Sequence, residues 1–375
     1  MAQHRSTEEA CLHGGASFAA LGDAFERLGD RPEIINADVL DAWFPPAPAI
    51  IEGLRDHLAW ALRTSPPTGC EGMIRTIARV RGVPPECVLP GGGSSDLIFL
   101  ALRDWLTPDS RVLLPDPAYG EYAHVLERVI GCRPDRLPLE RAEGYALPPD
   151  RLAEALRRRY DLVVLVNPNS PTGRHLRREE LEPVLAGAPA ETRFWLDETY
   201  VEYAGADQSL ERFAVSRDNV VVCKSMSKVY ALSGARAAYL CAPERVLRPL
   251  RRETPPWAVS LIGQIAAVKA LESPDYYAAR YAETHALRGA LAEDLAGLGL
   301  EVMPSDANFL LCHLPEGGLT GAEVERRCRE RGLFLRNAGS ISHRLGNYAI
   351  RLAVKDGETN RRMLEILGDL LSNAA

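Results

Sequence analysis

One short segment of the chain combines a lysine with side chains that bind anions. Lys228 comes shortly after the apolar residues 220–222, and Ser225 and Ser227 precede it. A lysine just beyond a strand can form an imine with a carbonyl compound when its amine is kept partly neutral. The two hydroxyls can donate to a phosphate, and Arg236 offers a planar fork to the same dianion. Alone, Ser-x-Ser-Lys is more often a polar turn with a solvated lysine, so the prediction depends on the accompanying motifs.

A glycine-rich stretch predicts a second contact for the same phosphate. Residues 90–96 read Pro-Gly-Gly-Gly-Ser-Ser-Asp and precede an apolar helical stretch that starts at Leu97. Small residues let the backbone approach an anion, and the first turn of a helix supplies free N–H groups and a partial positive charge. We therefore expect Ser94 and Ser95 to bind the phosphate. A capped helix start after a tight turn would give the same pattern.

An acidic residue at the end of another predicted strand suits a cationic aromatic ring. Asp197 directly follows the apolar residues 194–196. A carboxylate at the end of a buried strand is costly unless it is paired, and a protonated pyridine nitrogen is a suitable partner. Tyr200, three residues later, can then reach a phenolic oxygen on the same ring. A lone Asp in such a place is more often a helix cap.

Two further loops supply contacts for a flat ring. Residues 116–122 read Asp-Pro-Ala-Tyr-Gly-Glu-Tyr, and we expect Tyr119 to stack on the ring, with Tyr122 as the alternative. Residues 166–173 read Val-Asn-Pro-Asn-Ser-Pro-Thr-Gly, a turn that can present an amide side chain. Asn169 is the residue expected to hydrogen-bond the phenolic oxygen.

The elements around these motifs predict an α/β fold. Between about residues 50 and 240, helical stretches alternate with short apolar runs, which is typical of a mostly parallel sheet covered by helices. The polar motifs follow these runs, at the strand ends where open α/β sheets bind ligands. We expect a large domain at residues 51–243 and a smaller α+β domain at 244–375. Residues 1–50 should join the small domain and close the active site.

Composition narrows the class of partner. The 375 residues carry a formal charge of −7, which leaves no basic excess for nucleic acid or anionic lipid. The eight cysteines lack the spacings that hold a metal, and the first residues lack the apolar core of a signal peptide. We therefore expect a cytoplasmic enzyme with a small-molecule substrate, no membrane or nucleic-acid partner and no metal site.

These motifs, in this order, resemble fold-type-I pyridoxal-phosphate (PLP) enzymes of the class I/II aminotransferase superfamily, from His13 to about Leu370. Segments 307–311, 335–337 and 348–352 resemble the branch that holds histidinol-phosphate aminotransferase and threonine-phosphate decarboxylase. The resemblance implies a seven-stranded, mostly parallel sheet and a homodimer. It implies PLP as cofactor, bound as an imine. The residues to which it assigns cofactor roles are Lys228, Asp197, Tyr200, Ser225 and Arg236.

The same resemblance implies residues that bind the substrate. Arg351 matches an arginine that binds the substrate's carboxylate, and Arg336 matches one that faces a distal phosphate. His13, within Cys-Leu-His-Gly-Gly, resembles a histidine of threonine-phosphate decarboxylases that lies near the substrate phosphate. The alternatives are surface ion pairs for the arginines, with Glu121 as one acidic partner, and a solvated histidine.

Three departures from the family pattern concern the site. Ser170 stands directly before Pro171, where many relatives place the Asn that contacts the cofactor. Residues 63–69 read Arg-Thr-Ser-Pro-Pro-Thr-Gly and lack the tyrosine that the partner subunit commonly contributes. Residues 35–46 replace a shorter segment that usually closes the substrate pocket. The last departure predicts a substrate different from that of either namesake.

Three functions compete on these residues. In PLP enzymes the bond at Cα that stands perpendicular to the ring is the one that breaks, so the carboxylate's anchor decides the reaction. If His13, Arg336 and Arg351 bind a phosphate or phosphonate, the carboxylate is free to leave, and the sequence slightly favours this decarboxylation. If Arg351 binds the carboxylate, amino transfer follows. A PLP-binding regulator is disfavoured because no basic helix-turn-helix pattern precedes the large domain.

Overall fold

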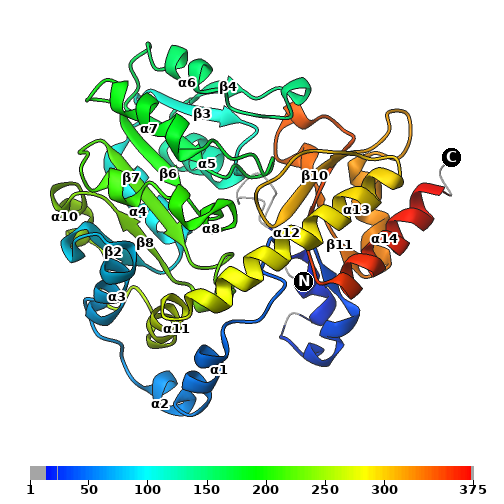
Figure 1. The fold of residues 1–375 in the computed structure, drawn as a ribbon, viewed down its shortest axis with the longest axis horizontal. Coiled ribbons are helices and arrows are strands. Elements are labelled where there is room, and N and C mark those ends of the chain that lie inside the picture. The colour runs from blue at the N-terminus through cyan, green and yellow to red at the C-terminus, as the bar shows by residue number, and fades with distance from the viewer. Residues whose placement is uncertain (1–13, 23, 373–375) are drawn as a thin grey trace.

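The computed structural model describes residues 14–22 and 24–372 and is built around one large sheet (Figure 1). Seven strands lie in the order β2-β8-β7-β6-β5-β3-β4, and all neighbouring pairs are parallel except those of β8 with β2 and β7. The predicted mostly parallel α/β fold is therefore confirmed. The strands are β2 (Val88–Gly91), β3 (Val112–Asp116), β4 (Asp135–Pro138), β5 (Leu162–Val166), β6 (Arg193–Asp197), β7 (Val220–Ser225) and β8 (Ala238–Cys241).

Helices cover both faces of this sheet, which explains its continuous apolar runs. All five residues of β5 are buried, and successive residues alternate between two hydrophobic clusters. Val163 and Leu165 belong to the cluster that includes side chains of α3, α6, α7 and α11, whereas Val164 belongs to the cluster that includes side chains of α4, α5 and α10. The helices are α3 (Glu71–Arg81), α4 (Ser94–Trp105), α5 (Gly120–His124), α6 (Pro149–Ala155), α7 (Arg178–Gly187), α8 (Val201–Ala204), α9 (Glu211–Ala214), α10 (Glu244–Glu253) and α11 (Leu261–Leu271).

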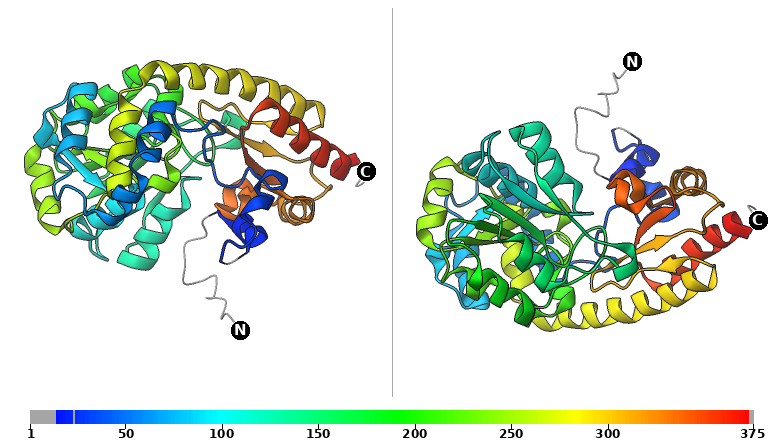
Figure 2. Two further views of the ribbon diagram at one scale, coloured as in Figure 1. Left: turned by 90° about the horizontal axis from the view of Figure 1, so that it is seen from below. Right: turned by 90° about the horizontal axis from the view of Figure 1, so that it is seen from above.

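A second, antiparallel sheet follows in the C-terminal part of the chain. Its order is β12-β13-β10-β9, and a separate two-stranded sheet joins β1 in parallel to β11. The long helix α12 extends along one side of the molecule from the large sheet to this second sheet (Figure 2). The elements are β1 (Ile35–Asn36), β9 (Glu301–Val302), β10 (Phe309–His313), β11 (Leu333–Phe334), β12 (Arg336–Asn337), β13 (Ala349–Ala353), α1 (Pro48–Arg55), α2 (Leu58–Arg63), α12 (Pro274–Gly297), α13 (Gly321–Glu330) and α14 (Gly357–Ser372). None of the helices in the described ranges has the length and apolar character needed to cross a membrane.

The packing of α10 and α11 bears on the expected division at residue 243. Helix α10 contacts α4 and β2, and α11 contacts α3 and α1. Both helices therefore pack with the large sheet, although they follow the expected boundary. We propose that the large domain extends through α11 and that the small domain begins within α12. The pairing of β1 with β11 supports the expected place of the N-terminal segment beside the small domain.

Candidate active site

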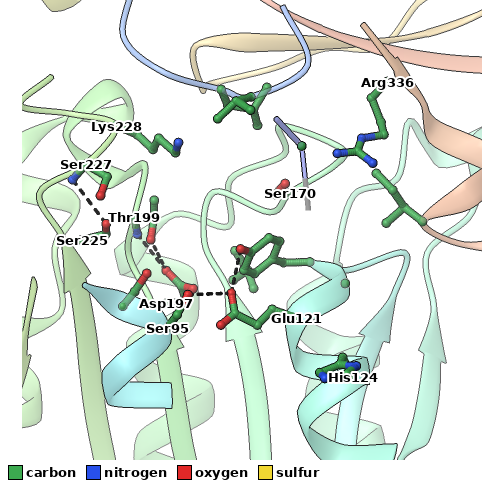
Figure 3. A pocket seen from close by; sticks show the side chains of 18 of the residues that line it. Ser95, Glu121, His124, Ser170, Asp197, Thr199, Ser225, Ser227, Lys228 and Arg336 are labelled. Atoms are coloured by element: carbon green, nitrogen blue, oxygen red, sulfur yellow. Dashed lines mark hydrogen bonds between the residues drawn. The ribbon is translucent and has the colours of Figure 1, made fainter. Parts of the chain in front are cut away.

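A cavity of about 630 Å³ lies at the carboxyl ends of β6 and β7 and reaches β12 and β13 (Figure 3). It brings together most of the residues that the sequence predicts for the site. The predicted residues that line it are Ser94, Ser95, Tyr119, Asp197, Tyr200, Ser225, Ser227, Lys228, Arg236, Arg336 and Arg351. His13 lies outside the described residues, but the adjacent Gly14 lines the cavity.

Lys228 enters the cavity from the loop after β7. Its Nζ lies 2.7 Å from Asp41 Oδ1, an ion pair between residues 187 positions apart in the chain. Ser225 and Ser227 are buried, and the Ser227 amide donates to the Ser225 hydroxyl. The loop therefore presents a primary amine beside two hydroxyls, as the sequence predicted for a covalently held, phosphorylated cofactor.

The start of α4 and Arg236 form a cradle for an anion. Gly93 has a φ of +106°, a backbone conformation that residues with a side chain rarely adopt, and Arg236 Nη2 occupies the space beside it, 2.2 Å from where a Cβ would lie. Ser94 begins the helix, where free backbone N–H groups favour a phosphate. The Ser95 hydroxyl donates to Glu121 Oε2 at 3.0 Å. Backbone N–H groups and Arg236 thus suit a phosphate at this end of the cavity.

Asp197 suits the nitrogen of a protonated ring. The side chain is 3% exposed, and its oxygens accept from the Tyr122 hydroxyl at 2.7 Å and from the amide and hydroxyl of Thr199 at 3.0 and 2.6 Å. Burial raises the pKa of Asp197 above its ordinary value, against the hydrogen bonds from Thr199 and Tyr122 that lower it. Because these partners carry no charge, a cation on the cavity side would stabilise the ionised carboxylate.

The aromatic residues differ in their access to the cavity. Tyr119 lines it and donates to Glu121 Oε2 at 2.8 Å. Tyr122 is fully buried, accepts from Trp195 Nε1 and donates to Asp197. The position of Tyr119 supports it over Tyr122 as the stacking residue. Tyr200 also lines the cavity, as the role expected at the phenolic oxygen requires.

The structure contradicts the expected position of Asn169. Its Nδ2 donates to the Pro117 carbonyl and the Thr172 hydroxyl, both at 3.0 Å, so the amide stabilises the turn instead of facing the cavity. Ser170, the next residue, lines the cavity and accepts from Arg351 Nη1 at 3.2 Å. The residue directly before Pro171 therefore takes the cavity position, and here it is a serine.

The two predicted substrate arginines have different partners. Arg351 is 7% exposed and donates through Nη2 to the Asp38 carbonyl at 3.1 Å. Arg336 Nε lies 2.7 Å from Asp38 Oδ1. Arg336 is therefore neutralised by Asp38 and not by Glu121, the partner considered from the sequence.

Three acidic residues of the site were not predicted as site residues. Asp38 and Asp41 reach it from residues 35–46, and Glu121 from the start of α5. The unusual length of the 35–46 segment was the available signal for the first two. No local pattern identified their partners, because those partners lie in β12 and in the loop after β7.

Comparison with known proteins identifies similar sequences. Residues 48–367 match the model of a family described as aminotransferase class I and II. A histidinol-phosphate aminotransferase of Anaeromyxobacter sp. (strain Fw109-5) is 34% identical over 311 residues, which cover 81% of this chain and 82% of that protein.

Solved structures share the fold. A histidinol-phosphate aminotransferase from Sinorhizobium meliloti, in complex with pyridoxal-5'-phosphate, matches with a TM-score of 0.80 at 21% identity over 98% of this chain and 100% of that one. The L-threonine-O-3-phosphate decarboxylase from Porphyromonas gingivalis matches with a TM-score of 0.79 at 23% identity, over 90% and 100%. At these sequence identities, the similarity to the two solved structures shows a shared fold.

Proposed function

This chain belongs to the class I and II aminotransferase family and is a PLP-dependent enzyme, and we propose that it transfers the amino group of a small amine substrate to a 2-oxo acid. One observation carries the proposal. A single cavity holds the Lys228 amine, the buried Asp197 carboxylate and the Arg351 guanidinium, with the anion cradle of Gly93 and Arg236 at one end.

Each side chain has a part in the proposed reaction. When bound, PLP draws electrons from a bond at the substrate's Cα. Asp197 would hold a proton on the ring nitrogen, and Tyr200 would donate a hydrogen bond to the phenolic oxygen. Arg351 would bind the substrate's anionic group and orient its Cα–H bond, and Lys228 would take up the Cα proton on Nζ and hold it for return.

The sequence slightly favoured decarboxylation over amino transfer, and the contacts of the described residues weaken the argument for it. It depended on a surplus of positive charge from His13, Arg336 and Arg351. Asp38 removes the net charge of Arg336, and His13 lies outside the described residues. The 34% identical relative is named as an aminotransferase, and amino transfer is therefore the function we propose.

The function can be tested with a substrate panel. The holoenzyme is incubated with 2-oxoglutarate and, in turn, with neutral amino acids, phosphorylated amino acids and histidinol phosphate. Glutamate formation and CO2 release are measured in the same reactions. We expect glutamate to form with at least one amine and CO2 release to stay at the level of the enzyme-free control. Stoichiometric CO2 without glutamate would overturn amino transfer in favour of decarboxylation.

The Asp38–Arg336 pair gives a prediction about specificity. Asp38→Asn should free Arg336 for a distal anion and lower the KM of doubly anionic substrates by about fivefold, on the order of 1 kcal/mol for the displaced ion pair. Arg336→Ala should raise the same KM. Steady-state kinetics with a neutral amino acid serve as the control, because that KM should change little in either variant. Equal changes for both substrates would show that the pair has only a structural role.

We further propose a homodimer, for which the apolar surface of α1 and α2 provides support. Ile51, Leu58, Trp60 and Leu62 are 42%, 45%, 47% and 70% exposed, and Figure 1 shows both helices at the edge of the molecule. Several large apolar side chains exposed on two adjacent helices are typical of an interface. Light scattering at micromolar concentration should give about twice the 41.1 kDa of one chain, and Leu62→Glu should reduce that mass. A fully active species with the mass of one chain would contradict the proposal.

A further inference from the structure

The segment that carries Asp41 is held in place by hydrogen bonds to the second sheet and to helix α12. On one side, the Ala353 amide donates to the Ala37 carbonyl and Asn308 Nδ2 donates to the Leu40 carbonyl. On the other side, Trp43 Nε1 donates to the Thr284 hydroxyl. The Ala47 amide, at the end of the segment, donates to the Tyr277 hydroxyl. Asp41 therefore lies on a backbone with many fixed contacts.

Asp41 directs one carboxylate oxygen at the Lys228 amine. Oδ1 is 2.7 Å from Lys228 Nζ and accepts from the Ser233 hydroxyl at 2.6 Å. Burial acts to raise the pKa of Asp41, but the charge and hydrogen bond of Lys228 and the hydrogen bond of Ser233 outweigh it, so the pKa lies below its ordinary value. The carboxylate is therefore ionised at neutral pH and faces the amine as a negative charge.

We propose that Asp41 is a positioning residue that holds Lys228 Nζ and stabilises positive charge on that nitrogen. The inference deepens the proposed function and rests on Lys228 as the cofactor's lysine. In the proton transfer, Nζ gains the proton that Cα loses, and the electron pair of the broken Cα–H bond stays with the substrate and cofactor. Asp41 favours the ammonium that this step produces, because a carboxylate at hydrogen-bond distance stabilises the charged form. It would likewise stabilise a proton on Lys228 Nζ when that nitrogen is bonded to the cofactor.

Other charged groups of the site act on the same nitrogen. Lys355, just past β13, opposes Asp41: burial, and secondarily the charge of Lys228, lowers the pKa of Lys355 to about 8, against the attraction of Asp41. Asp197 lies at the end of β6 and Arg236 beyond β7, and both line the cavity with Lys228. Tyr200 stays neutral because burial raises its pKa. Among these groups, Asp41 has the direct contact with Nζ.

A pH titration of the holoenzyme's visible absorption tests the proposal without substrate. The absorption reports whether the Lys228–cofactor linkage is protonated. A negative charge at Nζ extends the protonated form to higher pH, so Asp41→Asn should lower the linkage pKa by about one unit or more. Lys355→Gln removes a positive charge and should shift it upward. Asp150→Asn is the control, because this carboxylate is exposed and lies outside the cavity lining, and the linkage pKa of this variant should stay close to that of the unmodified enzyme.

The outcomes separate this inference from the proposed function. If the unmodified holoenzyme shows no visible band that borohydride removes, the assignment of Lys228 as the cofactor's lysine fails. If the band is present and Asp41→Asn titrates at the same pH as the unmodified enzyme, Asp41 does not stabilise the charge and the inference is wrong. A downward shift in Lys355→Gln would also overturn it. The unfolding temperature of each variant is also measured. A value equal to that of the unmodified enzyme shows that a shift in the linkage pKa does not result from a damaged fold.

Discussion

Lys228→Ala should lose covalent cofactor and nearly all amino transfer. The variant lacks the amine that forms the linkage and the base that moves the Cα proton. General acid–base catalysis alone contributes about 10²- to 10⁴-fold, so turnover should fall by roughly 10⁴-fold or more. Borohydride reduction followed by peptide mass mapping measures the first effect. The pyridoxyl adduct should lie on Lys228 in the unmodified enzyme. The variant should carry no adduct.

Two other lysines, Lys224 and Lys269, provide the control and the result that would refute the assignment. Lys224 is fully buried and its Nζ lies 2.7 Å from Glu202 Oε1 and 3.5 Å from Glu198 Oε2, so it is engaged as a structural cation. Lys269 lies on α11, outside the cavity lining. Lys269→Ala should therefore retain the adduct and the activity. An adduct on Lys224 or Lys269 in the unmodified enzyme would refute the assignment.

Asp197→Asn should remove most turnover while leaving the chain folded. An amide cannot stabilise a protonated ring nitrogen, so the cofactor would withdraw electrons less well. Losing one preorganised electrostatic contact commonly costs about 3–4 kcal/mol, or roughly 10²- to 10³-fold in kcat, and we expect at least this. The amide can still accept from Thr199, although its NH2 group would face the Tyr122 hydroxyl that now donates to Asp197. Steady-state kinetics and the thermal unfolding midpoint measure the two effects.

Tyr122→Phe is the matched control for Asp197. It keeps the carboxylate and removes one of its hydrogen-bond donors, a contact worth about 1.5–3 kcal/mol when the partner is charged. It should reduce turnover less than Asp197→Asn. Near-native turnover in Asp197→Asn would mean that Asp197 has a structural role and that the proposed mechanism is wrong at its centre.

Much of the fold was predictable because it depends on local patterns. Residues 162–166 are continuously apolar and form β5, which is buried between helices on both faces. Parallel strands place their carboxyl ends at one edge of a sheet, so motifs that follow such runs are brought together. For this reason Ser225, Lys228 and Asp197 could be assigned to one site, and the structure does place them in one cavity.

Side-chain direction within a turn was not predictable. Asn169 and Ser170 are neighbours in one loop, which is closed by two backbone hydrogen bonds: the Gly173 amide donates to the Asn169 carbonyl, and the Asn169 amide donates to the Arg174 carbonyl. That closure points the amide at Pro117 and leaves Ser170 on the cavity. Composition and spacing identify the turn but do not specify which of its side chains faces the ligand.

Periodicity and motif order alone indicate the α/β class, the family resemblance and the places of Asp197 and Lys228 at the ends of apolar runs. What these side chains contact depends on how distant segments pack. Asp41 meets Lys228 across 187 positions, and the Asp38 carbonyl meets Arg351 across 313. Such contacts arise when separate elements pack, and their energy depends on distance, burial and charge in three dimensions. No local pattern contains those quantities, so the charge around the reactive amine and the substrate arginines was settled by the fold.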